Sequence, residues 1–224
     1  MSEEFSNHAA DIDRIAHIPL HAQRAGYQHL LALAAGLEPV VTAVVHPCDK
    51  ESLSGTIEAA NARLIIPIFV APEKKQRTLA DALGFDLSPY ELVPAAHSHH
   101  AAAKAVALVR EGSAEALMKV SLHTDELMAE VVAIETDLPT GRRMSHVFIL
   151  DVPNCPRPLF LTDAAININP TLMDKRDIVQ NVIDLTHLLG INDPKVAILP
   201  AASAPIAHPS GSAYARRRNG PGSS

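Results

Sequence analysis

The chain has 224 residues, of which 47% are hydrophobic, and it carries a formal net charge of −6 at pH 7. This length and apolar content allow one large domain or two small ones with a sizeable core. The acidic balance argues against a nucleic-acid-binding protein, which usually presents a basic face. Two cysteines are too few for a disulfide scaffold. We expect a cytoplasmic protein without a membrane span, since no apolar run approaches roughly 20 residues and the acidic N-terminus lacks a secretion signal.

Strands and helices are predicted to alternate along the chain. Continuous apolar runs predict strands at 39–45, 64–70, 90–94, 116–120, 146–153, 158–163 and 195–199. Apolar residues at helical spacing, or alanine-rich runs, predict helices at 22–35, 51–62, 73–83, 101–110, 125–134 and 178–189. Asp49 or Ser52 can cap the second of these helices, and Pro67 indicates that the second strand is an edge strand or contains a bulge. The alternation predicts an α/β fold.

The segment from 146 to 200 is predicted to form the centre of the fold. The run at 146–153 is almost continuously apolar and is therefore expected to be a strand buried on both faces. Together with the following helix and the run at 195–199 it predicts a βαβ unit. Ligands bind beyond the carboxyl ends of strands in such sheets. The loops expected there carry Asp151, Arg157, Asp163 and Asn167.

Three regions are predicted along the chain. Residues 1–38 are expected to form an N-terminal helical segment, and residues 39–200 an α/β domain. Residues 201–224 consist mainly of Ala, Ser, Pro, Gly and Arg. Because such a segment cannot bury enough apolar surface to offset its ordering entropy, we expect a disordered tail.

Two candidate sites favour a structural interpretation. The histidines of His97-Ser98-His99-His100 could ligate a metal, but no carboxylate or cysteine lies beside them in sequence, and Ser98 is a plausible N-cap. Cys48 lies in a loop between a strand and a helix and could act as a nucleophile. A loop that shapes a ligand pocket is the favoured interpretation of this segment.

Other candidate residues fit anion binding. Ser121 to Thr124 lie between a strand and a helix, where hydroxyl and backbone N–H groups either bind an anion or cap the helix. Arg142 and Arg143 are either a solvated pair or a phosphate clamp, because the guanidinium group matches phosphate oxygens. Asp163 and Asn167 are turn formers as well as candidate ligand contacts.

Five segments carry a family resemblance, and they occur at 46–53, 116–128, 142–148, 157–168 and 174–181. Over about Pro39 to Leu199, the chain resembles the phosphate acetyl/butyryltransferase family in order and spacing. It is most similar to the forms that also occur fused behind an enoyl-CoA hydratase domain, which this sequence does not contain.

The resemblance implies an acyltransferase that moves an acyl group reversibly between coenzyme A and phosphate. It implies a two-subdomain α/β architecture similar to the isocitrate dehydrogenase fold, with the active site in the cleft, and a homodimer. No metal or cofactor is expected, since CoA is a substrate whose thiolate attacks the acyl phosphate. Ser121 and Asp163 are expected to be catalytic. The expected substrate-binding residues are His123, Thr124, Arg143 and Asn167. Acetyl and butyryl substrates both remain open.

The chain also departs from the family pattern. Arg63, Ala71 and Val120 stand where glycines are frequent in the family. The resemblance stops at Leu199 or Pro200, before the part of the family that carries CoA-binding Ser-Arg and Asp residues. We therefore expect a truncated enzyme with impaired activity and an unrelated tail that resembles out-of-frame translation. The alternative is a non-catalytic ligand-binding or interaction module. A dehydrogenase relative is disfavoured, because no glycine-rich dinucleotide fingerprint follows a strand.

Overall fold

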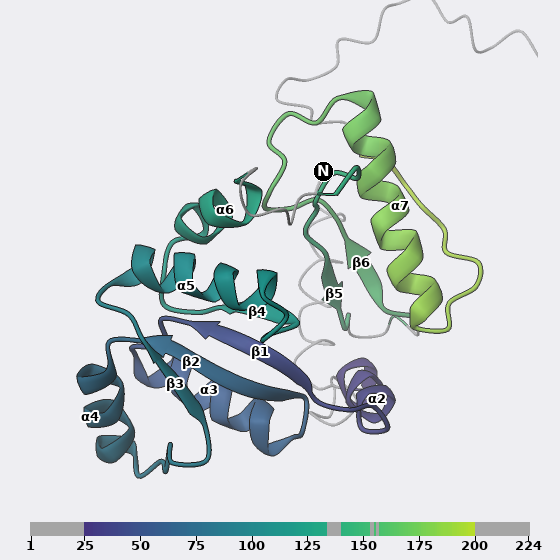
Figure 1. The fold of residues 1–224 in the computed structure, drawn as a ribbon. Coiled ribbons are helices and arrows are strands. Elements are labelled where there is room, and N and C mark those ends of the chain that lie inside the picture. The colour runs from purple at the N-terminus through teal and green to yellow at the C-terminus, as the bar shows by residue number, and fades with distance from the viewer. Residues whose placement is uncertain (1–24, 134–139, 153–154, 156, 200–224) are drawn as a thin grey trace, which may run out of the picture.

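Within the described residues, a parallel four-stranded sheet and the helices around it form the larger part of the fold (Figure 1). The computed structural model describes residues 25–133, 140–152, 155 and 157–199. The sheet has the order β3-β2-β1-β4. Its strands are β1 (Val40–Val45), β2 (Ile65–Ala71), β3 (Glu91–Pro94) and β4 (Ala116–Lys119). All three pairings are parallel, which confirms the predicted α/β fold.

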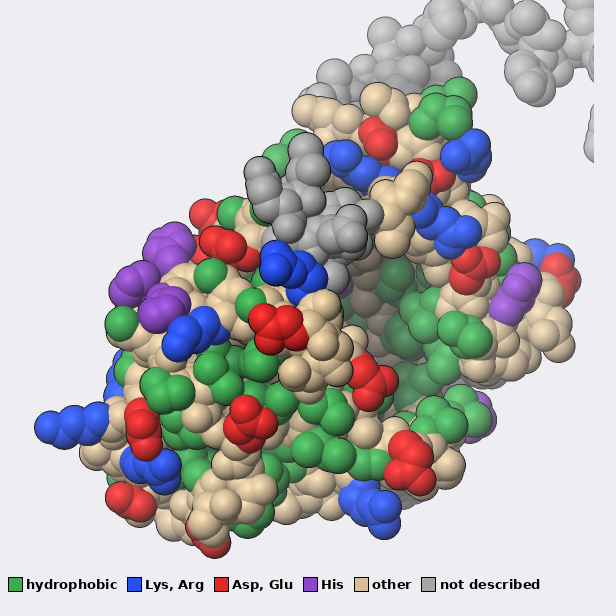
Figure 2. All heavy atoms as spheres, viewed as in Figure 1, with side chains coloured by type: hydrophobic (Ala, Val, Ile, Leu, Met, Phe, Trp, Pro, Cys, Tyr) green, Lys and Arg blue, Asp and Glu red, His purple; other side chains and the backbone are tan. Residues whose placement is uncertain are grey.

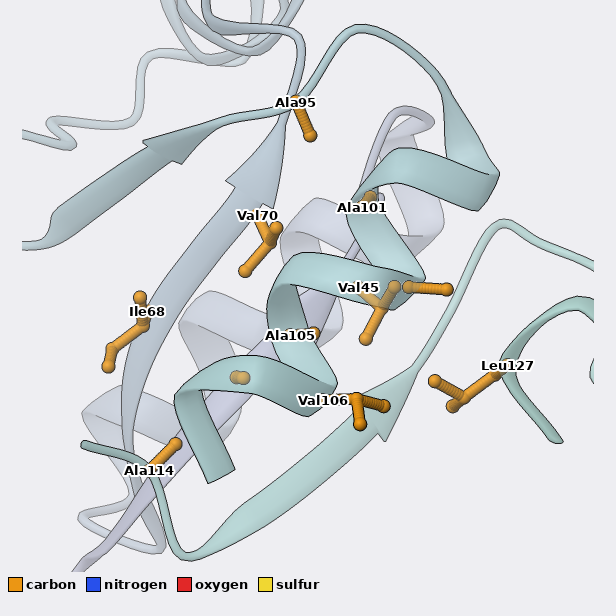
Figure 3. Packing of buried hydrophobic residues seen from close by; sticks show 11 residues of the cluster. Val45, Ile68, Val70, Ala95, Ala101, Ala105, Val106, Ala114 and Leu127 are labelled. Carbon is orange, nitrogen blue, oxygen red and sulfur yellow. The ribbon is translucent and has the colours of Figure 1, made fainter. Parts of the chain in front are cut away.

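Helices cover both faces of this sheet. They are α3 (Lys50–Asn61), α4 (Glu73–Leu83), α5 (Ser98–Arg110) and α6 (Thr124–Val132), and α2 (Ala25–Ala34) precedes β1. Ala43, Val45, Ile68 and Val70 of the strands pack against α5 (Figure 3). Phe69, which points to the opposite face, packs with α3 and α4. The core therefore lies between the sheet and its helices.

The helix ends follow the sequence signals with one exception. Asp49 caps α3 and accepts a hydrogen bond from the backbone N–H of Ser52. Gly84 ends α4 with a φ of 73°, and Gly190, with a φ of 80°, follows the helix α7 (Leu172–Leu188). Helix α5 is capped by His97, whose Nδ1 accepts from the N–H of His100, so the prediction that Ser98 is the N-cap was wrong.

Pro67 lies in an interior strand, so the prediction of an edge strand was wrong. It pairs in register with Thr42 of β1. The pairing of β2 with β3 begins at Ile68, one residue later. Proline is tolerated here because it lies outside the ladder on that side of the strand.

The segment from 146 to 199 differs from its prediction. It contains β5 (Phe148–Leu150), β6 (Leu159–Leu161) and α7 (Leu172–Leu188). β5 and β6 form an antiparallel pair rather than a parallel βαβ unit. Phe148 is 47% exposed and Leu150 is 37% exposed, so the expected burial of β5 on both faces was wrong. Within the described residues this sheet has two strands, and the face that carries Phe148 and Leu150 is left open.

Residues 195–199 do not form the predicted strand. Val196 is 48% exposed and Ile198 is 69% exposed. An apolar run becomes a strand only where a neighbouring strand satisfies its backbone, and no described strand pairs with this segment. The predicted tail at 201–224 and most of the N-terminal segment lie outside the described residues. None of the helices in the described part combines the length and hydropathy that a bilayer crossing needs.

Candidate functional site

Ser121 connects two loops at the carboxyl edge of the parallel sheet. Its Oγ accepts a hydrogen bond from the backbone N–H of Cys48 at 3.1 Å. The same oxygen lies 2.9 Å from the carbonyl oxygen of His46 and 3.1 Å from Oγ of Ser52. Ser121 therefore ties the β4–α6 loop to the β1–α3 loop. It does not cap α6, whose N-cap is His123 without a side-chain capping bond.

The β1–α3 loop holds a charged carboxylate and a neutral thiol. A hydrogen bond from the Ser121 hydroxyl, followed by one from the Ser52 N–H, lowers the pKa of Asp49. Burial raises the pKa of the Cys48 thiol, an effect that outweighs the opposing charge of Lys75. A thiol with a raised pKa is a poor nucleophile at neutral pH. This agrees with the interpretation of the loop as part of a pocket wall.

A cavity of about 490 Å³ opens beside these loops. Its lining includes His46, Ser98, Ser121, His123 and Glu126. A hydrogen bond from Ser98 lowers the pKa of Glu126, so this carboxyl group is charged at neutral pH. Helix α6 contributes Glu126 from its first turn. The cavity therefore combines hydroxyl and imidazole groups with one negative charge.

The histidines at the start of α5 form an exposed group. The ring centroid of His97 lies 6.3 Å from that of His99 and 5.9 Å from that of His100. Figure 2 shows histidine side chains gathered over this end of the molecule. Within the described residues, no set of three or more His, Cys, Asp or Glu side chains is placed to hold a metal ion. The capping role of His97 accounts for part of this cluster.

Asp163 organises the loop that follows β6. Its carboxylate accepts hydrogen bonds from the backbone N–H groups of Ala165, Ile166 and Asn167, each at 3.0 Å. It also accepts a short hydrogen bond from the side-chain amide of Asn167. Burial raises the pKa of Asp163, but these hydrogen bonds outweigh it and the net pKa is lowered. Asp163 is therefore a charged loop organiser that holds Asn167 in place.

Asn167 in turn orients Arg143. Its Oδ1 accepts a hydrogen bond from Nε of Arg143 at 2.7 Å, while its Nδ2 donates to the carbonyl oxygen of Met144 at 2.9 Å. The backbone of Arg143 is held as well, since its N–H donates to Asp177 and its carbonyl oxygen accepts from Asn181. The predicted residues Arg143, Asp163 and Asn167 thus form one connected network.

The two adjacent arginines have different environments. Arg142 Nη1 lies 2.6 Å from a carboxylate oxygen of Asp184 and 3.3 Å from the amide oxygen of Asn181. Arg142 is therefore an ion-pair partner of α7. In the described part of the chain, the hydrogen bond of the Arg143 side chain runs through Nε, which leaves its terminal nitrogens for another partner.

Arg143 lines a larger cavity of about 1100 Å³ between α6 and α7. Met128, Val131 and Val132 of α6 form an apolar wall. Arg143 and Asp174 lie on the polar wall. A ligand with an anionic group and a short apolar chain fits this cavity, because the anionic group can contact Arg143 while the chain contacts the apolar wall of α6.

The predicted site residues therefore fall into two groups. Ser121 and His123 line the smaller cavity, and Thr124 is the first residue of α6. Arg143 lines the larger cavity, while Asn167 and Asp163 reach it only through their hydrogen bonds to one another and to Arg143. Helix α6 lines both cavities. Asp174, the N3 residue of the capping box of α7, was not among the predicted site residues, although its segment carries part of the family resemblance.

Comparison with known proteins identifies the family. The family model "Phosphate acetyl/butaryl transferase" matches residues 93–217, which is more than half of the chain and includes part of the segment 201–224. The phosphate acetyltransferase of Rhizobium meliloti is 58% identical over 180 residues, which are 80% of this chain and 57% of that protein. The phosphate butyryltransferase of Clostridium acetobutylicum is 34% identical over 161 residues, which are 72% of this chain and 53% of that protein.

A solved structure agrees with these sequence matches. The branched-chain phosphotransacylase of Enterococcus faecalis superimposes with a TM-score of 0.56 at 26% identity, over 73% of this chain and 57% of that one. The α/β fold with a parallel sheet is therefore shared with phosphotransacylases, while likeness to the isocitrate dehydrogenase fold stays a prediction. The chain spans little more than half the length of these relatives. On the family match and these identities, the chain belongs to the phosphate acetyl/butyryltransferase family.

Proposed function

We propose that this chain is a phosphate acyltransferase, which transfers an acetyl or butyryl group between coenzyme A and phosphate. The observation that carries this proposal is the orientation of Arg143 by Asn167 at the wall of the larger cavity. The planar guanidinium group matches phosphate oxygens, and fixing Nε leaves the two terminal nitrogens for the ligand. The apolar wall of α6 offers a place for the acyl chain.

The other site residues are proposed to position this arrangement. Asp163 holds Asn167, and Asn167 holds Arg143, so both act on the phosphoryl group through the arginine. Ser121 fixes the two loops beside α6, where the first N–H groups of the helix, including that of Thr124, favour negative charge. His123 lines the smaller cavity next to Ser121.

The proposed reaction needs orientation more than covalent help from the protein. The thiolate sulfur of coenzyme A bonds to the acyl carbon, the bond from that carbon to the phosphate oxygen breaks, and phosphate leaves with the electron pair. A guanidinium group that contacts the phosphoryl oxygens stabilises the charge that develops on the leaving phosphate. Holding both reactants in one cavity lowers the entropic part of the barrier, because their translational and rotational freedom is already lost on binding.

An Arg143→Ala variant tests this assignment. Thioester formation from acetyl or butyryl phosphate and coenzyme A is followed by absorbance, and phosphate binding is followed by calorimetry. Loss of a preorganised charge contact should lower kcat/KM about 100-fold or more. Arg143→Lys should be more active than Arg143→Ala but less active than the unaltered chain, since lysine keeps the charge but lacks the paired N–H donors of the guanidinium group. Arg77→Ala, at an exposed arginine paired with Glu73, is the matched control and should leave both readings unchanged.

The same experiment distinguishes an acyltransferase from the alternative, a non-catalytic ligand-binding module. If the unaltered chain binds phosphate through Arg143 but forms no thioester, a non-catalytic ligand-binding module is the better description. If Arg143→Ala binds phosphate and turns over as the unaltered chain does, the assignment of the larger cavity fails. Full activity in Arg143→Ala would also remove the positioning roles of Asn167 and Asp163.

A further inference from the structure

The larger cavity lies between two units of the chain. Residues 25–133 form the sheet unit, and the described residues from 140 to 199 form the α7 unit. Extensive contacts between described elements, such as those of α5 with α6 and of β5 with β6, lie within one unit. The apolar wall of the cavity belongs to α6 of the sheet unit, whereas Arg143 and Asp174 belong to the α7 unit. The width of this cavity therefore depends on how the two units are held together.

Asp151 of the α7 unit caps a helix of the sheet unit. Its Oδ2 accepts hydrogen bonds from the backbone N–H groups of Gly26, at 2.8 Å, and Tyr27, at 3.4 Å. Both residues lie in the first turn of α2, where backbone N–H groups have no acceptor within the helix. The positive end of the helix dipole also favours a carboxylate there. A residue that is 125 positions away in sequence thus fixes the start of α2.

The contact leaves no room for a side chain at position 26. A Cβ added to Gly26 would lie 3.0 Å from Cγ of Asp151 and 3.1 Å from its Oδ2. Glycine is a poorer helix former than alanine, so the close approach of the carboxylate, rather than helix formation, gives the physical reason for glycine here. A Cβ added to Gly55 within α3 would meet no atom outside its own helix within 4 Å. The two helical glycines therefore differ in what surrounds them.

The β5–β6 pair connects Asp151 to the cavity. Asp151 directly follows β5, in which Leu150 pairs with Leu159 of β6. The loop after β6 carries Asn167, which holds Nε of Arg143. Figure 1 shows α2 at the lower end of the β5–β6 pair, while α6 lies toward its upper end. An anchor at the lower end therefore restricts where the pair carries Arg143 relative to α6.

We propose that Asp151 is a positioning residue, which holds the α7 unit at its distance from α6 by capping α2. Asp151 itself touches no substrate. When the contact is lost, the units separate more often, and the fraction of chains in which both walls can reach one ligand falls. The affinity for a ligand that contacts both walls falls by the same factor. The effect on ligands rests on the proposed function, whereas the spacing of the two units does not.

Spin labels on α6 and α7 measure this spacing directly. Ala129→Cys and Lys175→Cys place nitroxide labels at exposed positions of the two helices, in the full chain with Cys48 and Cys155 replaced by alanine. Double electron–electron resonance then gives the distribution of distances between the two labels. Each further substitution is made in this labelled chain, and its melting temperature reports whether it is folded.

Two substitutions break the contact from opposite sides. Asp151→Ala removes the acceptor, and Gly26→Ala displaces the carboxylate although alanine is the better helix former. Both should lengthen or broaden the distance distribution. Asp151→Asn keeps an acceptor oxygen and should restore the original distribution, because asparagine caps helices as well as aspartate does. Gly55→Ala and Asp193→Ala are the matched controls and should leave the distribution unchanged, since Gly55 is open and Asp193 pairs with its neighbour Lys195.

An unchanged distribution in both Asp151→Ala and Gly26→Ala overturns the inference. The double variant should be no broader than either single variant, because both remove the same contact, and an additive effect would equally overturn it. If Asp151→Ala does not fold, the comparison of Gly26→Ala with Gly55→Ala decides, and equal distributions for these two count against the positioning role.

Ligand binding connects the spacing to the proposed function. Butyryl phosphate, titrated calorimetrically, should bind about fivefold more weakly to Asp151→Ala, because it needs both walls. Its KM in thioester formation should rise by a similar factor with little change in kcat, since saturating ligand restores the original spacing. Inorganic phosphate has no chain to reach α6 and should bind both chains equally.

The two proposals fail differently. If the distances change as expected but butyryl phosphate binds with unchanged affinity, Asp151 positions the units and the larger cavity is not the ligand site, so the proposed function of this cavity fails. If the distances stay the same while Arg143→Ala loses phosphate binding, the proposed function stands and the positioning role of Asp151 fails.

Discussion

Replacing Arg63 by glycine is expected to stabilise the protein. Arg63 follows α3 with a φ of 57°, in the left-handed region. Its N–H donates to the carbonyl oxygen of Ala60, and the N–H of Leu64 donates to that of Ala59. These two bonds define a Schellman motif, in which the residue at this position is usually glycine. The resemblance to the family also expects glycine here, so the backbone geometry gives a physical reason for that expectation.

The size of the effect follows from two opposing terms. A non-glycine residue in the left-handed region costs roughly 1–2 kcal/mol. Glycine adds about 0.5–1 kcal/mol of backbone entropy to the unfolded chain. Arg63→Gly should therefore stabilise by about 0.5–1 kcal/mol, or roughly 1–4 °C in Tm for a domain of this size. Arg63 is exposed, so no side-chain packing is lost.

Urea unfolding followed by circular dichroism measures this difference. Arg77→Gly is the matched control, because it makes the same substitution in the interior of α4. It should destabilise by about 1 kcal/mol, since glycine is a poor helix former. If Arg63→Gly destabilises as much as Arg77→Gly, the left-handed residue is not strained and the reasoning is wrong.

Three further outcomes are expected. Asp163→Ala should leave three backbone N–H groups of its loop without their acceptor and lower the free energy of unfolding in urea by about 1–3 kcal/mol. The variant should also lower kcat/KM, because Arg143 is no longer held in position. An unchanged kcat/KM would show that the position of Arg143 does not depend on Asp163. The lowered pKa of Asp49 contributes stability above about pH 4, and this contribution is lost as the pH falls through the pKa of the folded state. Ser121→Ala removes a hydrogen bond that lowers this pKa, so the free energy of unfolding should depend less on pH in the acid range. An unchanged dependence on pH would contradict the assigned cause. Iodoacetamide at pH 7, followed by mass spectrometry, should modify exposed Cys155 before Cys48, whose pKa is raised by burial; the reverse order would contradict the inert interpretation.

The sequence alone was sufficient for the strands and helices of the parallel sheet, but not for the order of its strands. The segments that form β1 and β2 are continuously apolar because helices cover both faces of the sheet. Such an apolar run predicts a buried strand from the sequence alone. Local signals also placed helix ends correctly, as at Asp49 and Gly84, because a cap depends on a few neighbouring residues. The family resemblance was likewise carried by local motifs, and the comparisons confirm it.

Only the tertiary structure determined whether the apolar segments after residue 146 form strands and whether they are buried. The same local pattern that produced β1 produced a short exposed strand at β5, and no strand at 195–199, because burial depends on which elements pack against a run. Sequence also could not separate Arg142 from Arg143, two identical neighbours. The structure pairs the first with Asp184 of α7 and turns the second to Asn167, because the distant segments that meet each side chain differ. The roles of adjacent, chemically identical residues are set by contacts remote in sequence, and these contacts exist only in the folded chain.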